Sequence, residues 1–253
     1  MKKIIFFQAH PDDLEFFCPH FLHYLSKQPD KYEIRIASLT KGEYGAPQGL
    51  YDRIKGKKLG IIREKELYRA HARHGISPEQ IHFFGIFDGS VKFNESTLRK
   101  VQSYLKEEEP DIVFACEPRN TYYRHPDHMN TGKVVYLALK NLYHSAGPSL
   151  YFYGSINSTF RWPFNKSELQ FAYDLMYEHQ SQIHLWRYTT PLYRLMCRIH
   201  GMSVPGWKYA EGFRRVYYGK QSAKTQRLSY IQKIFLLLNV KVWPEKVTVV
   251  IEN

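Results

Sequence analysis

The chain has little cysteine and no long apolar run, and both shortages exclude classes of protein. Its three cysteines, Cys18, Cys116 and Cys197, are odd in number and widely spaced. This pattern argues against a disulfide framework or a thiolate zinc site and favours a reducing compartment, so we predict a cytoplasmic protein. None of the apolar runs, Ile234 to Leu238 among them, approaches the roughly 20 residues that a membrane-spanning helix needs.

The N-terminus also lacks an apolar segment of signal-peptide length. The opening MKKIIFFQAH has a basic start but only four apolar residues before Gln8. A signal peptide needs an apolar region of roughly 7–15 residues. We therefore expect residues 3 to 9 to form a buried strand of the mature protein.

Acidic residues are scarcer than basic ones, and the imbalance is uneven along the chain. The 253 residues hold 36 Lys and Arg against 24 Asp and Glu, a net charge of +12. Residues 186 to 253 carry twelve of these basic residues against three acids. Two interpretations stay open: a solvated basic face, or a surface that docks on membrane phosphates, an acidic glycan or nucleic acid.

Strands and helices are predicted to alternate. The apolar patterns predict strands at 3–9, 32–39, 80–85, 111–116 and 150–153, and helices at 13–27, 51–75, 96–109, 126–144 and 167–185. Such alternation implies parallel pairing, so we expect an α/β fold of the Rossmann-like type, with three α/β/α layers and a mostly parallel sheet. After Trp186 the pattern weakens, and only 213–218 and 246–252 look like strands.

Two polar clusters follow predicted strands. HPDDLE, residues 10 to 15, comes directly after the first strand, and YRHPDHMN, residues 123 to 130, follows the DIVFAC strand after a short loop. In a sheet of this kind, ligands bind beyond the carboxyl ends of the strands. Both clusters are therefore expected to project into the same crevice.

Together these loops offer His10, Asp13 and His128 around one point. Two imidazoles and a carboxylate are a usual ligand set for a catalytic zinc that keeps a position for water. Asp12 should point away from Asp13 and so be free to act on that water. A lone HPD is more often a turn or a helix cap, but two such clusters on one edge of the sheet favour a metal site.

His125 and Asp127 remain as an imidazole–carboxylate pair near the reacting carbonyl. Zinc lowers the pKa of a bound water from about 16 towards 7, and Asp12 would take the remaining proton. His125 would then help to stabilise the developing oxyanion. Either Asp12 or His125 could protonate the leaving amine.

The two clusters resemble the paired signature of the PIG-L, or LmbE-like, deacetylases, zinc hydrolases that remove acetyl from N-acetylglucosamine-type sugars. The resemblance extends over residues 3 to about 218. It includes four further segments, Thr40-Lys41-Gly42-Glu43, Arg63-Glu64-Lys65-Glu66-Leu67, Phe87-Asp88-Gly89 and His179-Gln180-Ser181-Gln182. The chain departs from the family's pattern at residues 16–19, where Phe-Phe-Cys-Pro replaces a small, Gly-rich segment.

The resemblance implies a role for each matching residue. It makes the metal ligands His10, Asp13 and His128, with one Zn²⁺ per chain or another divalent metal in its place. It makes Asp12 the general base and His125 the polarising or acid group, oriented by Asp127. It also implies that Arg63 and Asp88 contact the sugar, and that the deacetylase domain covers residues 1–220.

Other functions remain as alternatives. The same metal could serve a hydrolase of another amide or a phosphoesterase, although phosphoesterases commonly use two metals and only three ligands converge. A basic nucleic-acid-binding module would explain the tail but would leave both His–Asp clusters without a role. The aromatic residues Tyr122 and Tyr123 could stack on a sugar face. The sequence predicts no oligomeric state.

The tail, residues 221–253, is predicted to be a basic extension that packs on the same domain. Residues 224 to 243 contain no acid, and Leu228, Ile231, Phe235 and Leu238 line one side of a helix. Basic residues beside an apolar stripe are typical of a helix that lies on anionic lipid. A peripheral membrane location is therefore a second expectation, beside the simpler one that the stripe packs on the domain.

Overall fold

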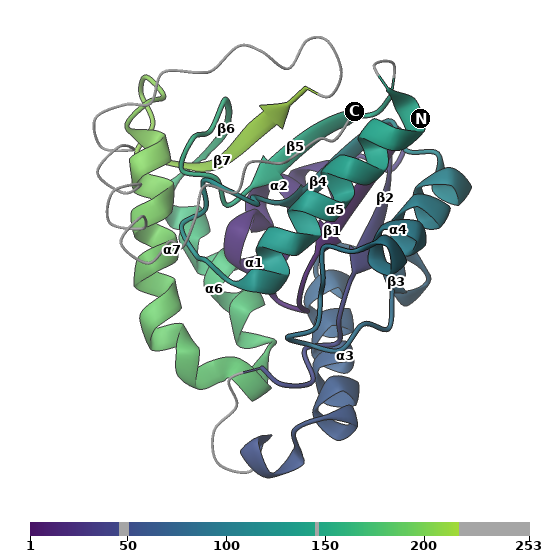
Figure 1. Cartoon of the computed structure of the whole chain (residues 1–253). Coiled ribbons are helices and arrows are strands. Elements are labelled where there is room, and N and C mark those ends of the chain that lie inside the picture. Colours follow the sequence, from purple (N-terminus) through teal and green to yellow (C-terminus); the bar gives the residue numbers. More distant parts are fainter. Residues whose placement is uncertain (46–50, 145–146, 218–253) are drawn as a thin grey trace.

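The computed structural model describes residues 1–45, 51–144 and 147–217, in which a seven-stranded sheet lies between two helical layers (Figure 1). The strand order is β3-β2-β1-β4-β5-β7-β6. The strands are β1 (Lys2–Gln8), β2 (Tyr32–Ser38), β3 (Ile81–Phe83), β4 (Ile112–Cys116), β5 (Ser149–Tyr153), β6 (Phe160–Phe164) and β7 (Tyr209–Val216). The first five in this order pair in parallel, whereas β7 is antiparallel to β5 and β6. The predicted fold class is confirmed.

Helices cover both faces of the sheet. They are α1 (Asp13–Phe17), α2 (Pro19–Ser26), α3 (Lys57–Ala72), α4 (Glu95–Glu108), α5 (Pro126–Tyr143), α6 (Leu169–Tyr177) and α7 (Trp186–Gly201). Successive side chains of a strand point to opposite faces. Accordingly Ile4 and Phe6 of β1 pack into one core with α1, α2, α6 and α7, while Ile5 and Phe7 pack into the other with α4 and α5.

The chain changes direction across the sheet at β1. From β1 it winds outward through β2 to β3, and then α4 carries it back to β4 on the other side of β1. The loops that leave β1 and β4 therefore start where the strand order reverses, which is where open α/β sheets bind ligands. This topology brings the two polar clusters of the sequence to one place.

Three predicted helices are divided in the structure, and the one expected over 51–75 consists of a 3₁₀ turn at Tyr51–Ile54 followed by α3. The helix expected over 13–27 is broken at Cys18, because Pro19 lacks a backbone N–H and starts the new helix α2. The helix expected over 167–185 is α6 flanked by 3₁₀ turns at Lys166–Glu168 and Gln180–Leu185. The break at Cys18 matters for the site, since it lets α1 serve as a separate short support for Asp13.

Two elements were missed, and each contains a proline. Pro163 lies in β6, which is tolerated because β6 is at the edge of the sheet. Pro191 lies inside α7, where it interrupts the pattern of a helix that buries Tyr193 and Met196. The last described strand also starts earlier than predicted, at Tyr209 rather than Phe213.

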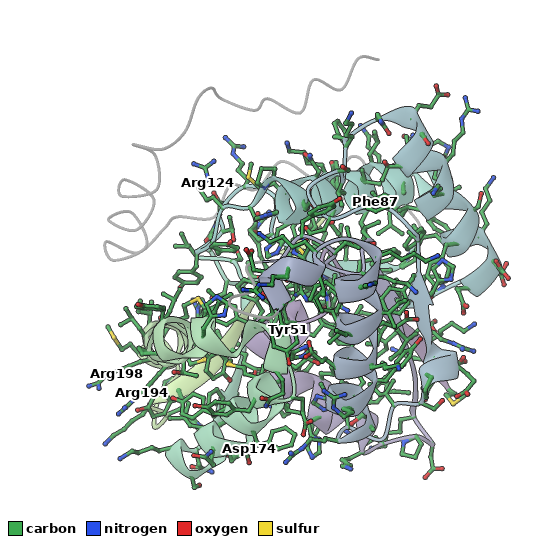
Figure 2. All side chains as sticks on the ribbon, turned by 90° about the horizontal axis from the view of Figure 1, so that it is seen from below. Tyr51, Phe87, Arg124, Asp174, Arg194 and Arg198 are labelled. Atoms are coloured by element: carbon green, nitrogen blue, oxygen red, sulfur yellow. The ribbon has the colours of Figure 1, made fainter. Side chains whose placement is uncertain are left out.

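The basic C-terminal region is described only up to residue 217. Arg194 and Arg198 of α7 are exposed and extend from the surface (Figure 2). The expected tail helix at 224–243, the strand at 246–252 and the extension 221–253 lie outside the described residues. Within residues 1–45, 51–144 and 147–217, no helix combines the length and apolar character needed to cross a membrane.

Candidate functional site

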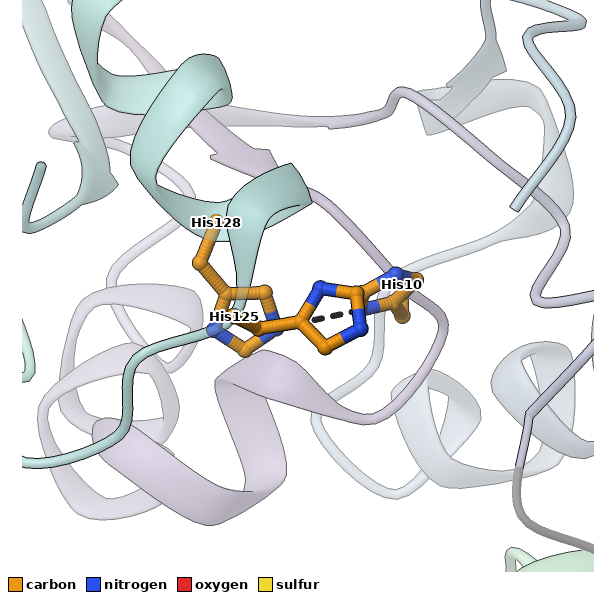
Figure 3. Close-up of side chains that lie close together, drawn as sticks. All are labelled: His10, His125 and His128. Atoms are coloured by element: carbon orange, nitrogen blue, oxygen red, sulfur yellow. Dashed lines mark hydrogen bonds between the residues drawn. The ribbon is translucent and has the colours of Figure 1, made fainter. Parts of the chain in front are cut away.

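Three histidines from two loops meet at the carboxyl ends of β1 and β4 (Figure 3). His10 follows β1, and His125 and His128 lie at the start of α5, where His125 is the N-cap residue. Pro126 occupies the first position of α5, where its missing N–H costs no hydrogen bond. The helix thus begins at a defined residue, which places His125 and His128 on its first turn beside His10.

The donor atoms of His10, Asp13 and His128 have the mutual spacing of metal ligands. Nδ1 of His10 lies 3.0 Å from Nε2 of His128, which lies 3.1 Å from Oδ1 of Asp13. The remaining pair, His10 Nδ1 and Asp13 Oδ1, is 3.9 Å apart. Nitrogen or oxygen ligands about 2.0–2.1 Å from a tetrahedral zinc lie about 3.4 Å from one another. These three residues, the open cluster, therefore fit a single small cation.

Backbone amides hold the Asp13 carboxylate in place. Its Oδ2 accepts hydrogen bonds from the N–H groups of Ala9 at 2.8 Å and His10 at 3.2 Å, which leaves Oδ1 to face the two histidines. Burial alone would raise the pKa of Asp13, but His128 and His10 lower it well below its ordinary value. The carboxylate is therefore ionised, the form that binds a metal.

The far side of the His10 ring contacts two further carboxylates. Nε2 of His10 lies 3.0 Å from Oδ1 of Asp88 and 3.3 Å from Oδ2 of Asp127. Burial would lower the pKa of His10, but Asp127, Asp13 and Asp88 raise it well above its ordinary value. A carboxylate on the second nitrogen fixes the orientation of a ligating imidazole. Asp88, for which the sequence suggested a sugar contact, thus lies against His10.

The carboxylate of Asp127 also positions the Asp88 loop. Its Oδ2 accepts the N–H of Gly89 at 2.7 Å, and its Oδ1 accepts that of Val91 at 3.3 Å. His125 is contacted instead by the Asp127 backbone N–H, which donates to Nδ1 of His125 at 3.2 Å. The expected orientation of His125 by Asp127 is therefore made by the main chain, and the carboxylate supports His10.

That hydrogen bond also determines the tautomer of His125. Because Nδ1 accepts, a neutral ring carries its proton on Nε2 and can donate from there. Burial, together with the nearby His10 and His128, lowers the pKa of His125, which keeps the ring neutral at pH 7. The half-buried ring stands edge-on to His10, with ring centres 4.8 Å apart.

Asp12 is held by Arg63 rather than left alone. Nη2 of Arg63, on α3, donates to Oδ2 of Asp12 at 2.8 Å, while Nη1 donates to the carbonyl of Gly42. The Asp12 side chain keeps 20% exposure, against 3% for Arg63. Gly42 has φ of +65°, and a Cβ atom there would lie 2.1 Å from Nη1 of Arg63. Arg63, expected to contact the sugar, therefore positions the carboxylate of Asp12.

Exposed aromatic side chains occur close to these residues in the chain. Tyr44 and Phe87 are each 56% exposed, and Phe87 is labelled in Figure 2. The Tyr44 N–H donates to Oδ2 of Asp88, the residue that follows Phe87. Tyr123 is 49% exposed, and its ring lies over His125, with centres 6.1 Å apart. Tyr122, the other aromatic residue expected at the site, turns instead towards His200, with Oη 3.3 Å from Nε2.

Two buried residues that support the site carry no signal in the sequence. Sγ of Cys116, at the end of β4, lies 3.7 Å from Oδ2 of Asp13 and 3.0 Å from Oη of Tyr153. The Tyr153 hydroxyl donates to the carbonyl of Phe7 at 2.8 Å. Only the pairing of β4 with β1 and β5 brings these groups behind Asp13, so no local pattern could reveal them.

Comparison with known proteins agrees with this geometry. Residues 5–139 match the family described as PIG-L, GlcNAc-PI de-N-acetylase. A diacetylchitobiose deacetylase of Thermococcus kodakarensis is 23% identical over 231 residues, 85% of this chain and 84% of the relative. A Bacillus anthracis protein described as "Probable N-acetyl-alpha-D-glucosaminyl L-malate deacetylase 2" is 31% identical over 154 residues, 59% of this chain and 65% of the relative.

A solved structure shows the same fold. The N,N'-diacetylchitobiose deacetylase of Pyrococcus horikoshii superposes with a TM-score of 0.73 at 23% identity, covering 85% of this chain and 84% of that one. The family match spans more than half of the chain and includes every residue of the open cluster. The chain accordingly belongs to the PIG-L family and is a hydrolytic N-deacetylase.

Proposed function

We propose that the protein removes the N-acetyl group of an N-acetylglucosamine-type sugar or glycoconjugate, with one Zn²⁺ held by His10, Asp13 and His128. The observation that carries this proposal is the spacing of the three donor atoms, 3.0, 3.1 and 3.9 Å, beside a carboxylate that keeps contact with solvent. A bound zinc would supply Lewis-acid polarisation of the acetyl carbonyl and lower the pKa of a water molecule towards about 7.

Asp12 acts as the general base in this proposal. Arg63 holds Oδ2 of Asp12, so Oδ1 can take a proton from the attacking water. The guanidinium keeps the carboxylate oriented before the reaction. Once Asp12 has accepted that proton, it is the residue that can return it to the departing amine.

His125 acts as a hydrogen-bond donor to the acetyl oxygen. With Nδ1 accepting from the Asp127 N–H, the proton on Nε2 is available for an oxygen that becomes negative in the transition state. A neutral ring suits this role, since it donates a hydrogen bond without needing to be protonated first. This assignment gives Asp12 both proton transfers and leaves His125 the electrostatic task.

Tyr44, Phe87 and Tyr123 are proposed to contact the sugar ring. Their exposed faces can stack on the apolar side of a pyranose, and Arg63 and Asp88, which also contact Asp12 and His10, are proposed to contact the sugar as the family resemblance implies. Aromatic stacking would tolerate different aglycones. The relatives act, by their names, on chitobiose, malate and phosphatidylinositol conjugates, so the shared acetamido sugar is the proposed recognition unit.

The test is primary-amine release from N-acetylglucosamine, diacetylchitobiose, an N-acetylglucosaminyl glycoside and a glycolipid by the zinc-loaded protein. An aryl phosphate serves as the comparison substrate. We expect amine release that an added chelator abolishes and that zinc restores. Phosphate release without amine release would contradict the proposal and favour the phosphoesterase alternative.

Location is a separate part of the proposal. All three cysteines are free and buried, in keeping with a reducing cytoplasm. The tail, residues 221–253, is proposed to bind either the domain or an anionic membrane surface. Co-sedimentation with anionic and neutral vesicles at low and high salt distinguishes these two: capture only by anionic vesicles at low salt supports the membrane, and no capture supports packing on the domain.

A further inference from the structure

A second histidine–carboxylate cluster lies behind the active site, on the other side of α1. Glu15 of α1 faces His71 in the last turn of α3, His74 just beyond it, and His179 after α6. Oε1 of Glu15 lies 3.5 Å from Nδ1 of His71, and Oε2 lies 3.5 Å from Nε2 of His179. These four residues are the closed cluster.

The closed cluster is cut off from water. Glu15, His71 and His179 have no exposed surface, and His74 has 1%. Burying a carboxylate without a partner costs several kcal/mol, so groups like these are normally hydrogen-bonded, paired or bound to a metal. Yet both oxygens of Glu15 and both ring nitrogens of His71 and His74 have no hydrogen-bond partner within the part of the chain that the structure describes.

The contacts of Glu15 are longer than an ordinary hydrogen bond, and their spacing suits a shared cation. An N–H···O bond spans about 2.7–3.2 Å, whereas two ligands of a tetrahedral zinc lie about 3.4 Å apart. The two contacts of Glu15 measure 3.5 Å, and the ligand atoms of Glu15, His71 and His74 all lie within 4.8 Å of one another. The unpartnered atoms therefore converge on a point between them.

We propose that the closed cluster is a second metal site, which takes a structural Zn²⁺ or a similar nitrogen-preferring cation. Glu15, His71 and His74 supply three ligands whose donor atoms lie within 4.8 Å of one another, and His179 pairs with the second oxygen of Glu15. Glu66, whose carboxylate holds the Ser181 N–H and hydroxyl, adds a nearby negative charge.

The position of this site gives it a structural purpose. It joins α1, α3 and the segment after α6, and α3 also carries Arg63, which holds the catalytic Asp12. A metal bound there would brace the helix that positions the base, although it would touch neither water nor substrate. This inference stands on the closed cluster alone and is independent of the reaction proposed for the open cluster.

The test counts metal ions on the full chain after zinc loading and removal of loosely bound metal, by elemental analysis and native mass spectrometry. We expect two zinc ions per wild-type chain. His128→Ala disables the open cluster and leaves the closed one intact, so this variant should retain one zinc. The paired variant His71→Ala/His74→Ala should also retain one and should melt at a lower temperature. His82→Ala, a histidine outside both clusters, should retain two.

Cobalt loading of the His128→Ala variant gives a second measurement, visible absorption, on a protein whose closed cluster carries no substitution. Tetrahedral coordination by histidine and carboxylate should produce visible absorption that zinc abolishes. One zinc per wild-type chain together with none in His128→Ala would overturn the proposal, even if the His71→Ala/His74→Ala variant failed to fold. Amine release by a protein with one zinc would then leave the deacetylase assignment standing while the second site was rejected.

Discussion

The open and the closed cluster are built from the same kinds of side chain, histidine and carboxylate. They differ in their access to water. In the open cluster Asp13 and His10 have polar partners behind them, and the neighbouring Asp12 keeps 20% exposure. In the closed cluster Glu15, His71 and His179 are fully buried, and the partners of Glu15 lie 3.5 Å away. The chemistry of the ligands is therefore not what makes a site catalytic.

What differs is the surrounding protein. Asp12, with Arg63 behind it, and His125, with the Asp127 N–H behind it, are oriented beside the open cluster. Within the described residues, the groups that interact with Glu15 are His71, His179 and His74, and the nearby Glu66 carboxylate holds the Ser181 N–H and hydroxyl. A metal in the open cluster can act on water, whereas one in the closed cluster can only hold helices together. Four experiments test this distinction.

The largest effect is expected from Asp12→Asn. The change removes the base without removing a metal ligand, so we expect kcat to fall about 10²- to 10⁴-fold while zinc content stays the same. The control is Asp52→Asn, which alters an exposed carboxylate paired with Lys55. A normal rate, or a loss of zinc equal to that of a ligand variant, would show that Asp12 has another role.

His125→Ala should have the next largest effect. Removal of one donor to a developing oxyanion costs about 10²- to 10³-fold in kcat. The matched change in the closed cluster is His71→Ala, which should alter the melting temperature more than kcat. If both variants slowed the reaction equally, or if His125→Ala lost zinc as His128→Ala does, the division between the clusters would be wrong.

Asp127→Asn should cause a smaller defect, because its carboxylate acts through His10. Loss of a carboxylate partner of a ligating histidine typically costs about 10- to 100-fold in metal affinity or activity. Competition with a chelator measures this directly for the open cluster. Asp174→Asn, at an exposed carboxylate, provides the control. Unchanged chelator competition would mean that Asp88 alone orients His10.

The smallest effect is expected on the free energy of unfolding, from removal of the buried ion pair between Glu117 and Arg214. Glu117, after β4, accepts Nε and Nη2 of Arg214 at 2.6 and 2.8 Å. Burial alone would raise the pKa of Glu117, but Arg214 lowers it below its ordinary value of 4.5. The unfolded chain therefore binds this proton more readily, so the pair stabilises the protein above about pH 4.5 and is lost as the pH falls through the folded pKa.

Urea unfolding from pH 6 to pH 3, with and without chelator, measures that loss. We expect Glu117→Gln to flatten part of the acid-side decline in the free energy of unfolding, and the chelator to leave this part unchanged. If the contribution of Glu117 to the free energy of unfolding changed when chelator was added, the ion pair would be coupled to the metal sites. The pair would then not be independent of the two clusters. Glu95→Gln, at an exposed carboxylate paired with Arg99, is the control.

Much of the fold and of the open cluster could be predicted because the relevant signals are short. The apolar run of β1 predicts a buried strand, the alternation of elements predicts a parallel sheet, and HPDD and HPDH each follow a strand directly. Strand ends are ordered by the sheet, so local motifs there acquire a predictable position. For this reason His10, Asp13 and His128 were expected together, and the structure places their donor atoms 3.0–3.9 Å apart.

Tertiary structure alone decided which contacts the remaining side chains make. The sequence offered Arg63 and Asp88 as sugar contacts, which stays a prediction; only packing shows that one also contacts Asp12 and the other His10. The closed cluster joins Glu15 to His71, His74 and His179, which share no motif and come from three separate segments. Their meeting depends on how α1, α3 and the turn after α6 pack on one face of the sheet. Such packing sums many weak contacts between distant residues, and no local pattern in the sequence records it.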